Sequence, residues 1–207
     1  MNCSFFFKLT GAFHEDGIAD TFDAFGGGWT RAEILRIMRD SRIGTYGAVG
    51  LLLTMGTKLA ALALILAVGT ANKDGSSIYS SVAVLITGHV MGRWACVYLL
   101  WAHRYLDEVE SSAPGKHFVL SVSTPRLLAG TVSAFAFTAC LGLPFDRLMV
   151  VWIACAIVTE FGGRYISSVI GGMIGDCLGA ANQMVEVVAY LCLAARPWNE
   201  IAAEIAT

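Results

Sequence analysis

The sequence predicts an all-α fold, a helical bundle that crosses a membrane several times, and three observations support this. Hydrophobic residues make up 56% of the 207 residues and charged residues only 14%, against roughly 25% charged residues in an ordinary soluble domain. The mean hydropathy is +0.65. Several apolar runs are long enough to cross the hydrocarbon layer as helices. The net charge of −2 gives no reason to expect a nucleic-acid partner.

The first element is acidic. The segment GAFHEDGIADTFDAFGGGW, residues 11–29, gathers Glu15, Asp16, Asp20 and Asp23 within nine residues. The last three have i, i+4, i+7 spacing, which places them on one face of a helix. Because neighbouring carboxylates repel one another, a divalent cation with phosphate oxygens as further ligands would stabilise this face, and Mg²⁺ favours such a set. We predict a metal site here; a solvated acidic helix face is the alternative.

A short amphipathic helix is predicted next, in the segment TRAEILRIMRD. Thr30 and Glu33 have the spacing of a capping box at its start. Ile34, Ile37 and Met38 form an apolar face, and the arginines face elsewhere. This pattern predicts a helix that lies along the membrane surface.

The stretch DSRIGTYG, residues 40–47, stands at the start of the first apolar run. Its two glycines let the backbone approach a ligand closely. Arg42 has the guanidinium geometry that binds phosphate through paired hydrogen bonds, and Asp40 and Ser41 adjoin it. We predict a phosphate contact here; an ordinary helix break with a cytoplasmic arginine is equally consistent with the pattern.

The whole chain, residues 1–207, is predicted to form a single domain, and the part after the acidic segment is predicted to consist of membrane spans and loops. The acidic and metal-binding segment covers 11–47 and is expected outside the membrane, and spans and loops cover 47–195. The five predicted spans lie at about 47–69, 78–101, 127–143, 148–161 and 177–195.

Loop charges predict the orientation. Eight lysines and arginines lie on the side of the acidic segment and three on the other side. Because cytoplasmic loops carry the excess of positive charge, the acidic segment is expected in the cytoplasm.

Several charged residues fall within the predicted spans. Lys58 and Arg93 are costly there, so a functional site is the default interpretation, and one internal ion pair with a carboxylate is the alternative. His89, one turn before Arg93, is predicted to be a packing residue. The stretch GGMIGDCLGAANQMVEVV adds Asp176 and Glu186, the latter deep in an apolar helix that must supply it with a partner.

These segments together resemble a known family. HEDGIADTFDAFGGG, DSRIGTYG and GGMIGDCLGA are similar to the signature stretches of the cobalamin synthases, also called adenosylcobinamide-GDP ribazoletransferases. The resemblance runs from about residue 9 onward and includes KLAAL at 58–62 and RW at 93–94. It implies a multi-pass enzyme of the bacterial inner membrane that requires Mg²⁺.

The reaction that the resemblance implies is an attack on a pyrophosphate. A ribose hydroxyl of α-ribazole, or of its 5′-phosphate, displaces GMP from adenosylcobinamide-GDP and forms adenosylcobalamin or its 5′-phosphate. Such chemistry needs charge neutralisation and positioning more than a protein nucleophile. Either Asp20 or Asp23 is expected to accept the hydroxyl proton. The predicted catalytic residues are Asp20, Asp23 and Arg42; the substrate- and phosphate-binding residues are Asp40, Ser41, Lys58, Arg93, Asp176 and Glu186; and the metal ligands are Glu15, Asp16, Asp20 and Asp23.

Three alternatives stay open at this stage. Members of the family usually have membrane-spanning sequence before the acidic motif, so the chain is expected to be a shortened synthase. The first alternative is that this shortened synthase is inactive. A phosphotransferase that acts on a CDP-alcohol is the second, although Asp20 stands where its motif has arginine. An ion-coupled transporter subunit is the third. Besides the two substrates and the lipid bilayer, a second copy of the chain or other corrinoid-pathway enzymes are the expected partners.

Overall fold

The computed structural model describes residues 12–71, 80–106 and 122–195 of the chain. Within these ranges the only pairing of the β type is an isolated bridge between Tyr105 and Met173, which confirms the predicted all-α class. The helices are α2 (Phe13–Gly27), α3 (Arg31–Ile37), α4 (Thr45–Ala71), α5 (Ser81–Ala102), α7 (Thr124–Ala139), α8 (Phe145–Ile170) and α9 (Gly175–Ala194).

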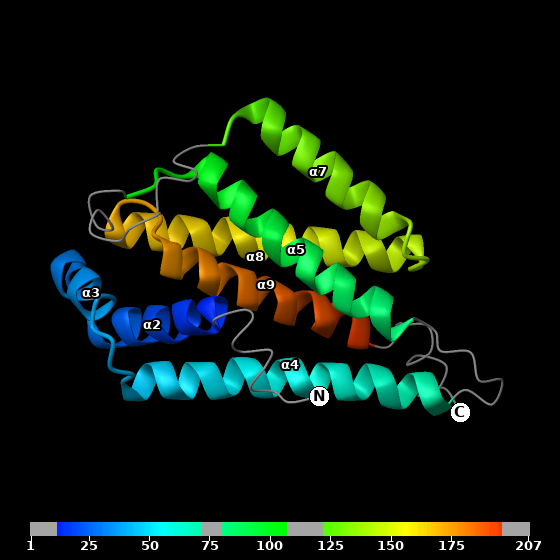
Figure 1. Cartoon of the computed structure of the whole chain (residues 1–207), viewed down its shortest axis with the longest axis horizontal. Coiled ribbons are helices and arrows are strands. Elements are labelled where there is room, and N and C mark those ends of the chain that lie inside the picture. Colours follow the sequence, from blue (N-terminus) through cyan, green and yellow to red (C-terminus); the bar gives the residue numbers. More distant parts are fainter. Residues whose placement is uncertain (1–11, 72–79, 107–121, 196–207) are drawn as a thin grey trace, which may run out of the picture.

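Helix α9 lies at the centre of the bundle. It packs against α2, α4, α5 and α8, and Figure 1 shows it running between α4 and α5. Glycines of α5 make the close approach possible, because a Cβ at Gly92 would lie 2.9 Å from the Asn182 amide and one at Gly88 would overlap the Tyr190 ring. Tyr190 is therefore completely buried at this crossing.

Three helices of the described residues are long and apolar enough to cross a membrane. They are α4 over Thr45–Ala67, α5 over Ser81–Ala102, and α9 over its full length. These match the first, second and fifth predicted spans. Leucines cover the outer face of α4 with half or more of their surface exposed, among them Leu52, Leu53 and Leu59. Such a face is suited to lipid contact.

The predicted third and fourth spans differ from the structure. Helix α7 has only 16 residues, roughly 24 Å of helix against a hydrocarbon layer of about 30 Å. Helix α8 has 26 residues, and it extends beyond the predicted 148–161 at both ends. The longer helix includes Asp146 and Arg164. Hydropathy places the end of a span where polar residues begin, but the backbone hydrogen bonds of a helix can continue past that point.

Helix α3 corrects the expectation of a helix that lies on the membrane surface. The predicted capping box is present, with Thr30 and Glu33 each accepting a hydrogen bond from the backbone of the other. Its apolar residues Ile34, Leu35 and Met38 are buried, however, in a cluster with residues of α2, α8 and α9. The apolar face of α3 is therefore covered by protein, because the end of α8 offers it a packing surface.

Arginines gather at one end of the bundle. This arginine-rich end comprises α3, the start of α4, the ends of α5 and α8, and the start of α9, all at the same side of Figure 1. Arg104, after α5, accepts a hydrogen bond through its carbonyl oxygen from Met173 (2.8 Å), and Leu106 donates to the Met173 carbonyl (2.8 Å). These bonds hold the α8–α9 connection, where Gly171 adopts φ 88°.

We expect Gly88→Ala to destabilise the fold, because the new Cβ would overlap the ring of Tyr190. Overpacking of this kind typically costs about 1–3 kcal/mol of the free energy of unfolding. Thermal unfolding in detergent, followed by circular dichroism, measures the effect. Gly162→Ala on α8 is the matched control, since a Cβ there meets no atom within 4 Å. Equal unfolding temperatures for the two variants would contradict the prediction.

Candidate active site

The acidic helix α2 is part of the bundle. It packs along both α4 and α9, with Ile18 and Ala24 completely buried. Gly17 lets it approach the first turn of α9, because a Cβ there would lie 2.7 Å from the Asp176 carbonyl oxygen. The predicted carboxylates of α2 are thereby brought next to Asp176, which is 159 positions further along the chain than Gly17.

Asp20 lies among other negative charges. Partial burial and the charges of Asp16, Asp176 and Asp23 raise the pKa of its carboxyl to about 7. A cation placed among these carboxylates would relieve the repulsion, and carboxylate oxygens are ligands that Mg²⁺ prefers. Within the described part of the chain, however, no three His, Cys, Asp or Glu side chains already stand close enough to hold a metal ion. The metal site stays a prediction.

Asp23 faces α4 instead of the other acids. The residue is only 8% exposed, and its carboxylate accepts hydrogen bonds from the backbone amides of Gly44 (2.6 Å) and Gly47 (2.7 Å). The Gly47 amide lies in the first turn of α4 and the Gly44 amide just before the helix, where N–H groups lack partners within the helix. The predicted helical stack of Asp16, Asp20 and Asp23 is thus present in α2, but its last member binds backbone amides of a neighbouring helix.

Arg42 and Asp40 bind each other at the arginine-rich end. The guanidinium donates through Nη2 to Asp40 Oδ2 (2.6 Å) and through Nε to Oδ1 (2.9 Å), and the Arg42 side chain is 86% exposed. Hydrogen bonds from Arg42 lower the pKa of Asp40 to about 2. Ser41 between them is exposed. A phosphate that bound Arg42 would therefore have to replace Asp40 as the acceptor of the guanidinium hydrogen bonds.

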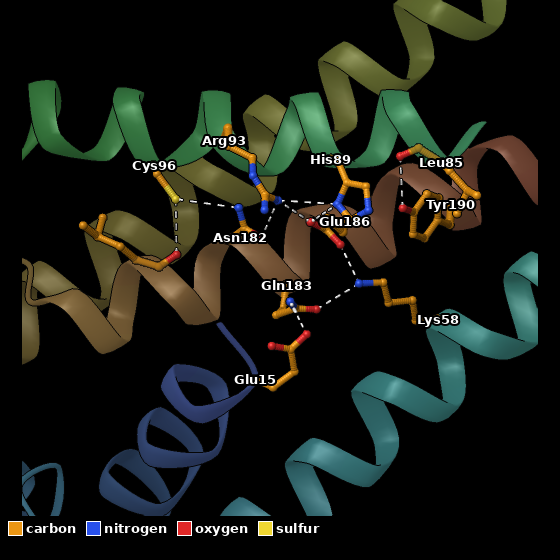
Figure 2. A network of polar contacts seen from close by, with 11 residues as sticks. Glu15, Lys58, Leu85, His89, Arg93, Cys96, Asn182, Gln183, Glu186 and Tyr190 are labelled. Atoms are coloured by element: carbon orange, nitrogen blue, oxygen red, sulfur yellow. Dashed lines mark hydrogen bonds and ion pairs between the residues drawn. The ribbon is translucent and has the colours of Figure 1, made fainter. Parts of the chain in front are cut away.

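A second polar group lies inside the bundle and surrounds Glu186, as Figure 2 shows. The Glu186 side chain is 1% exposed. Lys58 from α4 binds its Oε2 at 2.5 Å, and Arg93 and His89 from α5 both bind its Oε1 at 2.8 Å. We call these four residues the Glu186 cluster. The internal ion pair that the sequence analysis gave as an alternative is therefore present. His89 was predicted to be a packing residue, but its ring nitrogen contacts the Glu186 carboxylate.

Gln183 joins the Glu186 cluster to the acidic helix. Lys58 donates to its Oε1 (3.1 Å), and its Nε2 donates to Glu15 Oε1 (3.2 Å). Burial and the nearby charge of Arg93 lower the pKa of His14, on the same end of α2. The predicted metal ligand Glu15 thus contacts a glutamine. Sequence reasoning missed Gln183, although its i−3 spacing from Glu186 places both on one face of α9.

The predicted site residues therefore fall into two regions. One holds Asp16, Asp20 and Asp176 near the arginine-rich end, and the other is the Glu186 cluster with Lys58 and Arg93. Glu15 connects to the second region through Gln183, and the Asp40–Arg42 pair stands apart at the surface. The first region is a candidate cation and phosphate site; the second holds α4, α5 and α9 together.

This fold and site define a helical membrane protein with an acidic helix packed among its spans. The chain belongs to the cobalamin-5-phosphate synthase family of membrane enzymes, whose family model matches residues 3–194.

Curated relatives agree with this assignment. The adenosylcobinamide-GDP ribazoletransferase of Polaromonas sp. (strain JS666) is 36% identical over 194 residues, 90% of this chain and 68% of the relative. The protein of the same name from Shewanella sp. (strain W3-18-1) is 36% identical over 190 residues, 89% of this chain and 66% of the relative. The chain thus spans about two thirds of the length of these relatives. No solved structure matches the chain.

The Glu186 cluster yields a stability prediction. Glu186→Gln removes the carboxylate that faces Lys58, whose side chain is only 15% exposed, and breaking a buried pair by removing one partner costs about 3–5 kcal/mol of the free energy of unfolding. Lys58→Met should cost less, because Glu186 keeps Arg93 and His89. Unfolding by sodium dodecyl sulfate in mixed micelles compares the two variants. A larger loss for Lys58→Met would show that Glu186 is not the centre of the cluster.

Asp20 yields a pH prediction. Its pKa rises from 3.8 to about 7 in the folded chain, so between these values the folded chain binds more protons than the unfolded one. Its contribution to stability is therefore present at low pH and is lost as the pH rises toward 7. We expect Asp20→Asn to raise the unfolding temperature at pH 8 relative to the wild type and to change it little at about pH 3, below the unfolded pKa of 3.8. An equal effect at both pH values would contradict the assigned pKa.

Proposed function

We propose that this chain transfers the adenosylcobinamide-phosphate group from adenosylcobinamide-GDP to α-ribazole or its 5′-phosphate in cobalamin biosynthesis. The ribose hydroxyl attacks the phosphorus on the cobinamide side of the pyrophosphate, the bond to the GMP oxygen breaks, and the hydroxyl proton passes to the enzyme. The products are GMP and adenosylcobalamin or its 5′-phosphate. The names of the curated relatives support this activity, and one observation carries the site: the crowding of Asp20 by Asp16 and Asp176.

The carboxylates of this region are of the chemical type that a magnesium ion binds, although they do not stand close enough to hold one among the described residues. Asp16 and Asp20 on α2 and Asp176 on α9 offer hard oxygen ligands, and burial together with their mutual repulsion raises the pKa of Asp20 in the absence of a cation. Bound there, Mg²⁺ would neutralise charge on the pyrophosphate and on the departing GMP. The substrate phosphates would complete the ligand set, as is usual for Mg²⁺ sites.

The residues of the chain supply proton transfer and orientation. Of the two candidate bases, Asp23 has each oxygen occupied by a backbone amide, so we assign the proton acceptance to Asp20. Arg42 would turn from Asp40 to a phosphate oxygen when the substrate is bound. Lys58 and Arg93, paired with Glu186, serve the scaffold.

We also propose the orientation of the enzyme in the bacterial inner membrane. The arginines of α3 and of the segment before α4 lie at the arginine-rich end, as does the start of α9, which carries Asp176. Under the positive-inside rule this end faces the cytoplasm, where nucleotide-linked substrates are available.

The activity test uses membranes that contain this chain, with adenosylcobinamide-GDP, α-ribazole and Mg²⁺. We expect GMP release and cobalamin formation in equal amounts, and loss of both on chelation. Asp20→Asn should keep insertion and folding but lose at least about a hundredfold in rate, the scale of general-base and charge contributions. GMP release without cobalamin, or full activity of the variant, would overturn the proposal.

A further inference from the structure

We propose that Asp23 is a positioning residue that clamps the acidic helix α2 to the start of α4, and that it is neither a cation ligand nor the base. Its catalytic consequence rests on the proposed function. The clamp itself is a property of the fold and can be tested without activity.

Both oxygens of the Asp23 carboxylate accept a hydrogen bond. Oδ2 accepts from Gly44 N at 2.6 Å and Oδ1 from Gly47 N at 2.7 Å, one amide for each oxygen. The side chain is buried, with 8% of the residue exposed. Backbone amides at a helix N-terminus are suited to a negative charge, because they are unpaired and lie at the positive end of the helix dipole. Asp23 is therefore compensated without a metal ion.

The glycines of α4 are shaped for this contact. A Cβ at Gly44 would lie 2.5 Å from Asp23 Oδ1, and a Cβ at Gly47 would overlap the carboxylate and lie 2.7 Å from the Ala19 carbonyl oxygen. One turn further, a Cβ at Gly50 would overlap the ring of Phe22. Three glycines at a spacing of three residues thus form the face of α4 on which α2 rests. The glycines of DSRIGTYG therefore admit the Asp23 side chain and leave no room for an added Cβ.

The clamp fixes the two parts of the candidate site relative to each other. Asp23 is three residues after Asp20, and Gly44 is two residues after Arg42. The bond from Gly44 to Asp23 closes a loop of 21 residues that contains α3. The bond therefore holds the segment that carries Arg42 against α2, within one helical turn of Asp20. Asp23 would affect the reaction by positioning Asp20 and Arg42.

The experiment compares four variants of the full chain in detergent micelles. Asp23→Asn removes one acceptor, because its amide nitrogen faces a backbone N–H, and Gly47→Ala disturbs the same contact from the side of α4. Asp20→Asn removes a proposed cation ligand. Gly56→Ala is the matched control in α4, since a Cβ there meets no atom within 4 Å. The measurements are amide hydrogen exchange over residues 44–47, Mn²⁺ affinity by electron paramagnetic resonance, and kcat and KM for adenosylcobinamide-GDP.

We expect Asp23→Asn and Gly47→Ala to speed amide exchange over residues 44–47 and to leave Mn²⁺ affinity within about threefold of the wild type. Both should lower kcat about tenfold to a hundredfold with little change in KM, since a displacement of about 1 Å can cost that much. Asp20→Asn should weaken Mn²⁺ binding at least about tenfold and leave the exchange unchanged. Gly56→Ala should match the wild type in every measurement.

Three results would overturn the proposal: Mn²⁺ affinity lost in Asp23→Asn as in Asp20→Asn, amide exchange unchanged in Asp23→Asn, or a wild-type kcat in both clamp variants. If Asp23→Asn does not fold, Gly47→Ala decides by the same criteria. A wild-type chain without activity would reject the proposed function, and the exchange and Mn²⁺ measurements would still decide whether Asp23 is a clamp or a ligand.

Discussion

The compensation of one buried carboxylate determines how the spans are arranged. Glu186 lies in the central helix with 1% of its side chain exposed, and a charge in that position is tolerated only when partners surround it. The partners come from two other helices, Lys58 from α4 and Arg93 from α5. Any arrangement that separates these helices leaves a charge in apolar surroundings, so the ion pairs select one packing among the many that apolar helices allow.

The place of the acidic helix follows from that packing. Near its start, α2 reaches the Glu186 cluster through Glu15 and Gln183, and near its end Asp23 binds the first amides of α4. Charges at both ends are therefore compensated by the protein, whereas Asp16 and Asp20 between them repel each other and Asp176. Asp20, in the middle of the helix, is the residue whose carboxyl pKa is raised by burial and by these neighbouring charges.

Sequence reasoning predicted the helices and the family, because apolar runs and contiguous motifs carry those signals. It placed three of the five spans and the capping box of α3 correctly. It did not show that Lys58, His89 and Arg93 meet at Glu186, since periodicity gives the face of one helix but not the helix opposite. For the same reason the i, i+4, i+7 stack predicted three equivalent acids, and only the position of α4 separates Asp23 from the other two. The apolar face of α3 was expected to meet the membrane surface, whereas the end of α8, unknown from sequence, covers it.

The order in which the cluster is synthesised has a consequence for assembly. Lys58 and Arg93 precede Glu186 by 128 and 93 residues, which at about 5–20 residues per second is on the order of ten seconds of translation. Through that interval each cation enters the membrane without its counter-ion, at a cost of about 2.5–3.5 kcal/mol on insertion scales. The ion pairs that join α4 and α5 to Glu186 can therefore form only after α9 has been synthesised.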